Sequence, residues 1–214
     1  MTYLQLVNNV LRRIREEEVS TVNETTYSKM VGDFVNDAKR LTEDAWDWSG
    51  LRRTLIVNTV DGTFQYSLVG TQNRGKILDV VNNDEDYFLE YQTAHWFNNQ
   101  FLANNPTEGA PYVYSYNGVD SNGDTIVDLY PVPDKAYAVN FNMVLPQADL
   151  TDDLTDLLVP AQPIIHLAVA LLARERGETG GTSTAEYFAI ADRHLGDALA
   201  LDAAKHPEET VWYS

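Results

Sequence analysis

Apolar residues recur at helical spacing near the start of the chain. Between residues 3 and 16 they fall on one stripe, which predicts a short amphipathic helix. Thr2 and Gln5 have the spacing of a capping box at the first turn of this helix. A second helical pattern runs from about residue 24 to residue 48, and Ser49-Gly50 is a suitable stop because glycine readily adopts the left-handed conformation beyond a helix end.

In the middle of the chain the apolar period shortens toward two, which is typical of strands. Residues 54–59 and 64–68 alternate, and Asp61-Gly62 between them predicts a β-hairpin. Further strands are predicted, each bounded by Asn, Gly or Pro turn residues, at 76–81, 112–116, 125–130 and 137–145. The stretch from Gln92 to Phe101 is compatible with either a short helix or a loop.

Helical patterns return after residue 150. The stretch 164–176 is apolar on nearly all sides, which predicts a buried helix, and Pro160 and Pro163 suit its first turn. Ser183 with Glu186 predicts a capping box for a last helix, which ends at His206-Pro207.

Together these patterns predict an α+β fold. Helix pairs at the two ends of the chain need apolar partners, so we expect them to form one four-helix bundle into which an antiparallel β-sandwich or barrel is inserted. The expected domains are 1–50 with 150–206 for the bundle and 51–149 for the β domain, followed by an extended C-terminal tail over 207–214.

Composition narrows the class of protein. With 214 residues, 44% hydrophobic and 22% charged, the chain is long and apolar enough for a globular core. It contains no cysteine, so disulfides, thiolate zinc sites and cysteine nucleophiles are excluded. We expect no membrane span, because no apolar stretch is long enough, and no secretory signal at the N-terminus. A soluble protein made in the cytoplasm is expected.

The charge balance argues against broad nucleic-acid binding. Fifteen Lys and Arg face 32 Asp and Glu, for a net charge of −17. Proteins that grip phosphates do so with Lys and Arg, which this chain lacks in excess. DNA that passes the protein without sticking to it is compatible with this charge.

No motif nominates a catalytic residue or a cofactor. The sequence has no Gly-x-Ser-x-Gly elbow and no phosphate-binding loop, and Gly180-Gly181 is interpreted as a helix–helix turn. Neighbouring carboxylates at Asp152-Asp153 and in 84–86 are interpreted as solvated surface rather than a glycosidase pair. None of the histidines has metalloprotease spacing, and a structural role is expected for each of His95, His166, His194 and His206.

Two further motifs leave alternatives open. The segment 120–128 alternates oxygen ligands, as a calcium loop does, but glycine stands at its fourth position and Pro131 at its twelfth. An Asn122-Gly123 hairpin turn explains it with fewer assumptions, so no metal is predicted. Six aromatic residues could line a sugar-binding groove, although alternating tyrosines on one strand face are usually core; they are Trp96, Phe97, Phe101, Tyr112, Tyr114 and Tyr116.

Several short motifs, taken in order, resemble the head-to-tail adaptor (connector) proteins of short-tailed bacteriophages, the group that includes the tail tubular protein A family. The motifs are Val19-Ser20-Thr21-Val22, Ala45-Trp46-Asp47-Trp48, Asn122-Gly123-Asp124, Leu129-Tyr130-Pro131-Val132-Pro133-Asp134, Asp149-Leu150-Thr151, and Leu158-Val159-Pro160 before the Ala-rich helix 164–173. By order of elements, the resemblance covers nearly the whole chain.

The resemblance implies a structural protein of the virion neck, without catalysis. Such adaptors form a twelve-membered ring beneath the portal protein, offer a platform to the tail nozzle, and let genome DNA leave through the centre. The helical domain and C-terminal segment contact the portal, which here indicates Pro207, Val211, Trp212 and Tyr213 as portal-binding residues. An aromatic tail suits an interface anchor, but it can also fold back on its own bundle. The alternative function is a tail protein whose β domain binds host-surface glycans.

Overall fold

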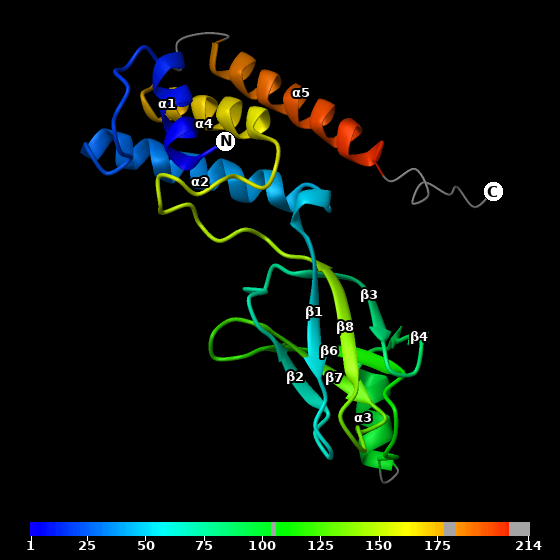
Figure 1. The fold of residues 1–214 in the computed structure, drawn as a ribbon. Coiled ribbons are helices and arrows are strands. Elements are labelled where there is room, and N and C mark those ends of the chain that lie inside the picture. The colour runs from blue at the N-terminus through cyan, green and yellow to red at the C-terminus, as the bar shows by residue number, and fades with distance from the viewer. Residues whose placement is uncertain (104–105, 178–182, 206–214) are drawn as a thin grey trace, which may run out of the picture. The chain divides into compact units, whose positions relative to one another are not determined.

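The chain divides into two compact units in a computed structural model that describes residues 1–103, 106–177 and 183–205 (Figure 1). One unit combines residues 1–50 with the described residues from 147 onward, and the other comprises residues 51–146. The fold is mixed α+β, as the sequence predicts.

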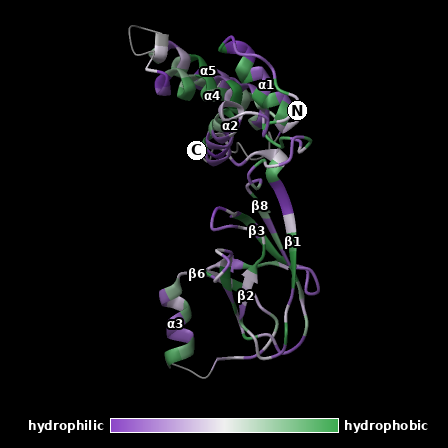
Figure 2. Ribbon diagram, turned by 90° about the vertical axis from the view of Figure 1, so that its left-hand side faces the viewer, coloured by the Kyte–Doolittle hydropathy of each residue, from purple (hydrophilic) through white to green (hydrophobic). Residues whose placement is uncertain are grey.

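The first unit contains four of the α-helices. They are α1 (Tyr3–Arg13), α2 (Thr26–Asp44), α4 (Ala161–Glu175) and α5 (Ser183–Ala203). Helix α4 packs against each of the other three, which explains why it is apolar on most sides (Figure 2). In its middle, Ala168, Val169 and Ala170 are all buried. The prediction of a buried helix here is confirmed.

Side-chain caps define the start of the two N-terminal helices. The capping box at Thr2 and Gln5 is confirmed, since each side chain accepts a hydrogen bond from the other residue's backbone N–H. Helix α2 begins at an equivalent pair, Thr25 and Ser28. It ends at Asp44 rather than at residue 48, because Trp48 turns back and its indole N–H donates to the carbonyl oxygen of Thr42. The predicted capping box at Ser183 lies outside the described side chains.

In its described residues, the second unit contains two open sheets and one α-helix. In chain order its elements are β1 (Arg52–Asn58), β2 (Gln65–Leu68), β3 (Lys76–Asn82), β4 (Tyr87–Phe88), β5 (Glu90–Tyr91), α3 (Ala94–Ala103), β6 (Val113–Val119), β7 (Thr125–Tyr130) and β8 (Ala138–Val144); a single 3-10 turn, Ser49–Leu51, precedes them. The sheet orders are β1-β8-β3-β4 and β2-β7-β6-β5. Of the two alternatives for the stretch from Gln92 to Phe101, a short helix or a loop, the structure shows the helix, α3.

Neither sheet closes on itself, so the barrel alternative is wrong. Both sheets contribute buried side chains to one core, including Val127 and Leu129 of β7 and Val139 and Phe141 of β8. The two open sheets therefore share one core. The expectation of purely antiparallel pairing is also wrong at one place, because β5 pairs with β6 in parallel.

The predicted hairpin at Asp61-Gly62 does not form. Strand β1 pairs along its length with β8, whereas β2 pairs with β7 in the other sheet. The chain does turn at this point: Gly62 has a φ of 73°, and its N–H donates to the carbonyl of Pro133 at 2.9 Å. The turn connects β1 in one sheet to β2 in the other. Turn residues thus indicated where the chain reverses but not which strand each neighbour joins.

Candidate functional site

The residues expected to bind a portal lie outside the part of the chain that the structure describes. Pro207, Val211, Trp212 and Tyr213 all belong to this undescribed C-terminal segment. The structure describes the end of α5, which precedes this segment in the sequence, as far as Lys205.

Asp202, near the end of α5, fixes this helix to the 3-10 turn that follows α2. Its carboxylate is buried and accepts hydrogen bonds from the backbone N–H of Ser49 at 2.9 Å and from the Ser49 hydroxyl at 2.6 Å. Lys205 lies 2.9 Å from the same carboxylate. Burial alone raises the pKa of Asp202, but the bonds from Ser49 and the charge of Lys205 outweigh it and lower the pKa to about 2. The last turn of α5 is thus held by an ionised carboxylate.

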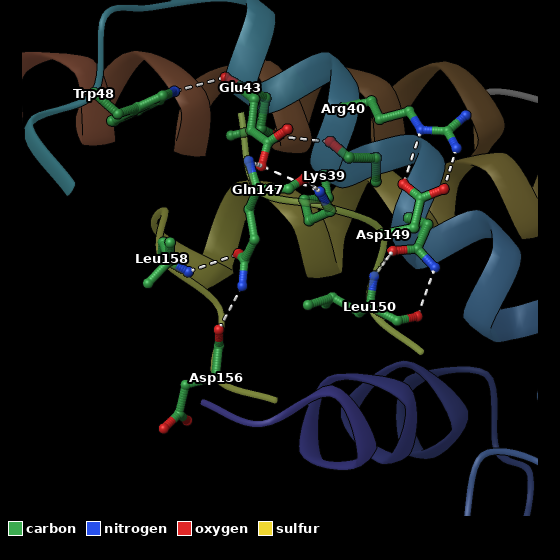
Figure 3. A network of polar contacts seen from close by, with 12 residues as sticks. Lys39, Arg40, Glu43, Trp48, Gln147, Asp149, Leu150, Asp156 and Leu158 are labelled. Carbon is green, nitrogen blue, oxygen red and sulfur yellow. Dashed lines mark hydrogen bonds and ion pairs between the residues drawn. The ribbon is translucent and has the colours of Figure 1, made fainter. Parts of the chain in front are cut away.

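A second buried polar group attaches the segment that follows β8 to α2. Lys39 and Glu43 form an ion pair of 3.1 Å, one turn apart on α2, and both side chains are almost completely buried (Figure 3). The ammonium of Lys39 donates to the carbonyl of Gln147 at 2.6 Å, and Glu43 accepts the backbone N–H of Gln147 at 3.2 Å. The pair therefore satisfies both backbone groups of one residue.

The next residues continue the same attachment. The amide of Asn36 donates to the carbonyl of Leu150 at 3.1 Å and accepts the Leu150 N–H at 2.9 Å (Figure 3). Arg40 forms a two-pronged ion pair with Asp149 on the exposed side of α2. Residues 147–150, which form neither helix nor strand, are in this way bonded to three successive turns of α2. These bonds satisfy the backbone groups of the segment in place of a sheet.

The sequence reasoning missed Lys39, Glu43 and Asp202. A signal for Lys39 was available, because it falls on the apolar stripe of α2 between the buried residues Val35 and Thr42. A charged residue in such a position needs a buried partner, and Glu43 stands four residues later. No comparable pattern marks Asp202, whose partner Ser49 is 153 residues away in the chain.

Two histidines that the sequence treated separately meet in the helical unit. His166 of α4 stacks on His194 of α5 with ring centroids 4.1 Å apart, and the guanidinium of Arg13 lies 2.9 Å from Nε2 of His166. Burial, followed by the charges of Arg13 and His194, lowers the pKa of His166 to about 4. Together with Arg13 of α1, the two histidines connect three helices, α1, α4 and α5.

The acidic segment 120–128 is engaged in turn and cross-strand bonds. Asp120 accepts the backbone N–H groups of Asn122 and Asp124, and Gly123 has the left-handed φ of 85° that the hairpin requires. Asp128 accepts bonds from Gln65 and Asn117 instead. The hairpin-turn interpretation accounts for these residues. Among the described residues, no cluster of three His, Cys, Asp or Glu is arranged to hold a metal ion.

The aromatic residues considered for a sugar groove are divided between core and surface. Phe97 is buried, and the rings of Trp96, Phe97, Phe101 and Tyr112 all lie within 6.3 Å of the Tyr130 ring, by centroid distance. These contacts pack α3 onto the second sheet. The expected common face is only partly core, because Tyr114 is buried whereas Tyr112 and Tyr116 are exposed.

The paired carboxylates have separate structural partners. Asp84 accepts the backbone N–H of Ala138, Asp152 accepts that of Leu154, and Asp153 accepts that of Val22. Nothing in the described chain assembles them around a common point. None of the described helices is long and apolar enough to cross a membrane.

Comparison with known proteins places the chain in a family. No curated protein matches it. A family model described as SU10 adaptor protein matches residues 1–210, which covers both compact units. The match spans nearly the whole sequence and agrees with the resemblance carried by its short motifs. The chain therefore belongs to the SU10 adaptor protein family.

Proposed function

We propose that this phage adaptor protein joins the portal to the tail as one subunit of a twelve-membered ring. In this proposal the helical unit and residues 207–214 contact the portal, the ring presents a platform to the tail nozzle, and genome DNA passes through its centre. The observation that carries the proposal is the adaptor family match over residues 1–210.

The base of α5 supports a role for the C-terminal segment. Asp202 ties the last turn of α5, which precedes residues 207–214 in the sequence, to Ser49 of the helical unit. In those following residues Trp212 and Tyr213 are the kinds of side chain that dominate interface energetics. The net charge of −17 suits a passage that DNA traverses without adhering.

The test is the mass of the complex, measured by light scattering, for this protein mixed with the portal oligomer from the same genome. The full chain is expected to bind as a ring of defined stoichiometry. A chain ending at residue 206 retains Asp202 and Lys205, so it is expected to fold normally but to lose portal binding. The double variant Trp212→Ala and Tyr213→Ala should reproduce most of this loss, whereas Glu208→Ala in the same segment should not.

Failure of the full chain to bind an intact portal oligomer would contradict the proposal. The alternative, glycan binding by the β unit, has one supporting observation, since Tyr91 and Tyr116 are exposed with ring centroids 6.0 Å apart. That function predicts binding to host-surface sugars that truncation at residue 206 leaves unchanged.

A further inference from the structure

An arginine-lined pocket stands out on this strongly acidic chain. It lies where α1 and α4 end, has a volume of about 270 Å³, and is lined by Arg13, Arg15, Arg176 and Tyr187 with an apolar floor from α4. We call it the arginine pocket. Arg176 is held in place by Glu16 at 2.7 Å and by the hydroxyl of Tyr27. Arg176 is thereby already paired with a carboxylate, whereas no carboxylate among the described residues pairs with Arg13 or Arg15. Guanidinium groups in such a hollow attract a carboxylate or another anion.

Arg15 occupies a backbone position at which glycine is the usual residue. The N–H of Glu16 donates to the carbonyl of Leu11 and the N–H of Arg15 donates to that of Arg12, which is the Schellman arrangement at a helix end. Arg15 is the left-handed residue of this motif, with a φ of 61°. Within the described residues, no hydrogen bond or ion pair engages its exposed side chain. A non-glycine residue at this strained position suggests that its side chain has a use.

An acidic groove lies at the opposite end of α1. It has a volume of about 470 Å³ and is lined by Tyr3, Asp33 and Asp149, with Lys29 also on its wall. Asp149 is already paired with Arg40, so Asp33 is the carboxylate that the groove offers to a partner. Burial raises the pKa of Tyr3 to about 12, and the negative charges of Asp33, Asp153 and Asp149 add to this effect. Asp33 is exposed. We call this hollow the acidic groove.

The two hollows lie on one compact unit, separated by roughly the 16 Å length of an eleven-residue helix. A ring is built from heterologous contacts, in which one patch of each subunit meets a different patch of the next. Such contacts need two complementary surfaces on the same chain. The arginine pocket presents the exposed Arg15 and the acidic groove presents the exposed Asp33, which are opposite in charge.

We propose that the arginine pocket of one copy receives the acidic groove of a second copy, with Arg15 opposite Asp33 at the contact. This inference rests on the proposed ring. Opposite charges at such a contact select the head-to-tail partner and oppose pocket-to-pocket pairing. They also make the association sensitive to salt, since exposed pairs are screened.

A charge-swap experiment tests the contact. Arg15→Glu alone and Asp33→Arg alone each place like charges opposite one another, so each is expected to weaken ring formation on the portal at least tenfold in midpoint concentration. In an equimolar mixture, subunits of the two variants can alternate around the ring, so that opposite charges meet at every contact and assembly should be restored. The double variant Arg15→Glu with Asp33→Arg also places opposite charges at every contact, so it should assemble by itself. Arg193→Glu, an exposed change outside both hollows, is the control for net charge.

A folding defect is separated from a contact defect by Arg15→Gly. Glycine relieves the backbone strain at this position, so the variant should unfold at a higher denaturant concentration than the wild type and still assemble less well. Circular dichroism of every variant establishes that it is folded.

The outcomes distinguish this inference from the proposed function. If the wild-type protein forms no complex with the portal, the proposed function fails, and the same variants are then compared by self-association of the concentrated protein. If the wild type associates and Arg15→Glu associates equally well, the contact is refuted. It is also refuted if the mixture of folded variants fails to recover, or if Arg15→Glu changes only DNA retention in the assembled particle.

Discussion

At the scale of single residues, the charges of the helical unit matter most where they are buried. Lys39, Glu43 and Asp202 have almost no solvent contact, and each bonds to backbone groups of a segment far away in the sequence. A buried charge contributes to stability only when its partners are present, so these contacts fix which segments meet. The exposed Arg15 differs, because its backbone is strained and its side chain faces outward.

Replacement of Asp202 by Asn tests the anchor of α5. Its folded-state pKa of about 2 lies below the ordinary 3.8, so the ionised form stabilises the fold above about pH 4, and this contribution declines as the pH falls toward 2. We expect Asp202→Asn to lower the free energy of unfolding by about 2 kcal/mol at pH 6 and by about 1 kcal/mol at pH 3. Urea unfolding at both pH values measures this.

The matched control is Asp197→Asn, an exposed carboxylate on the same helix, which should change the free energy of unfolding by less than about 0.5 kcal/mol at either pH. An effect of Asp202→Asn that stays constant between pH 6 and pH 3 would show that the charge is not its source.

At the scale of elements, close approach between helices depends on a missing side chain. Gly32 lies inside α2, where a Cβ atom would meet the hydroxyl oxygen of the buried Tyr3 at 2.2 Å and a methyl group of Val22 at 3.0 Å. Helix α1 therefore docks on α2 through a glycine. Gly196, in the middle of α5, has open space around the same position.

The two glycines predict opposite effects of one substitution. Alanine is the better helix former by about 1 kcal/mol, so Gly196→Ala should raise the free energy of unfolding by roughly 0.5–1 kcal/mol. Gly32→Ala should lower it by about 1–3 kcal/mol, because Tyr3 must move out of its buried position. Thermal and urea unfolding of both variants measure the difference. Stabilisation by Gly32→Ala would contradict the packing described for Tyr3.

At the scale of the whole molecule, we propose that the two compact units correspond to the predicted helical and β domains. Strands β1 and β8 are paired along their whole length, and the N–H of Leu145 donates to the carbonyl of Leu51 at the point where the chain enters and leaves. The ends of the inserted unit are thus adjacent. An insertion with adjacent ends can fold without its host domain.

A fragment of residues 51–146 is therefore expected to fold alone, with one cooperative urea transition and near-ultraviolet circular dichroism from its packed aromatics. A fragment of residues 59–146 lacks β1, which leaves an edge of β8 unpaired, and it should not show this transition. If fragment 51–146 remains unfolded in water while the full chain folds, the two units are not independent domains.

The sequence by itself determined the order and kind of most elements. The apolar stripe in residues 3–16, the apolar helix after Pro163 and the capping box at Thr2 are local patterns, and local backbone preferences act whatever the rest of the chain does. The short motifs likewise carried the resemblance to phage adaptors, in agreement with the family match.

Only the tertiary structure decided which distant segments meet. Asp61-Gly62 marked a turn, yet β1 and β2 joined different sheets, because strand pairing is set by the partners available across the whole fold. Asp202 bonds to Ser49, Glu43 bonds to Gln147, and the arginine pocket lies between the ends of two helices that are more than 150 residues apart in the sequence. A linear pattern reports the preferences of neighbours in sequence, whereas a buried charge or a binding pocket depends on neighbours in space.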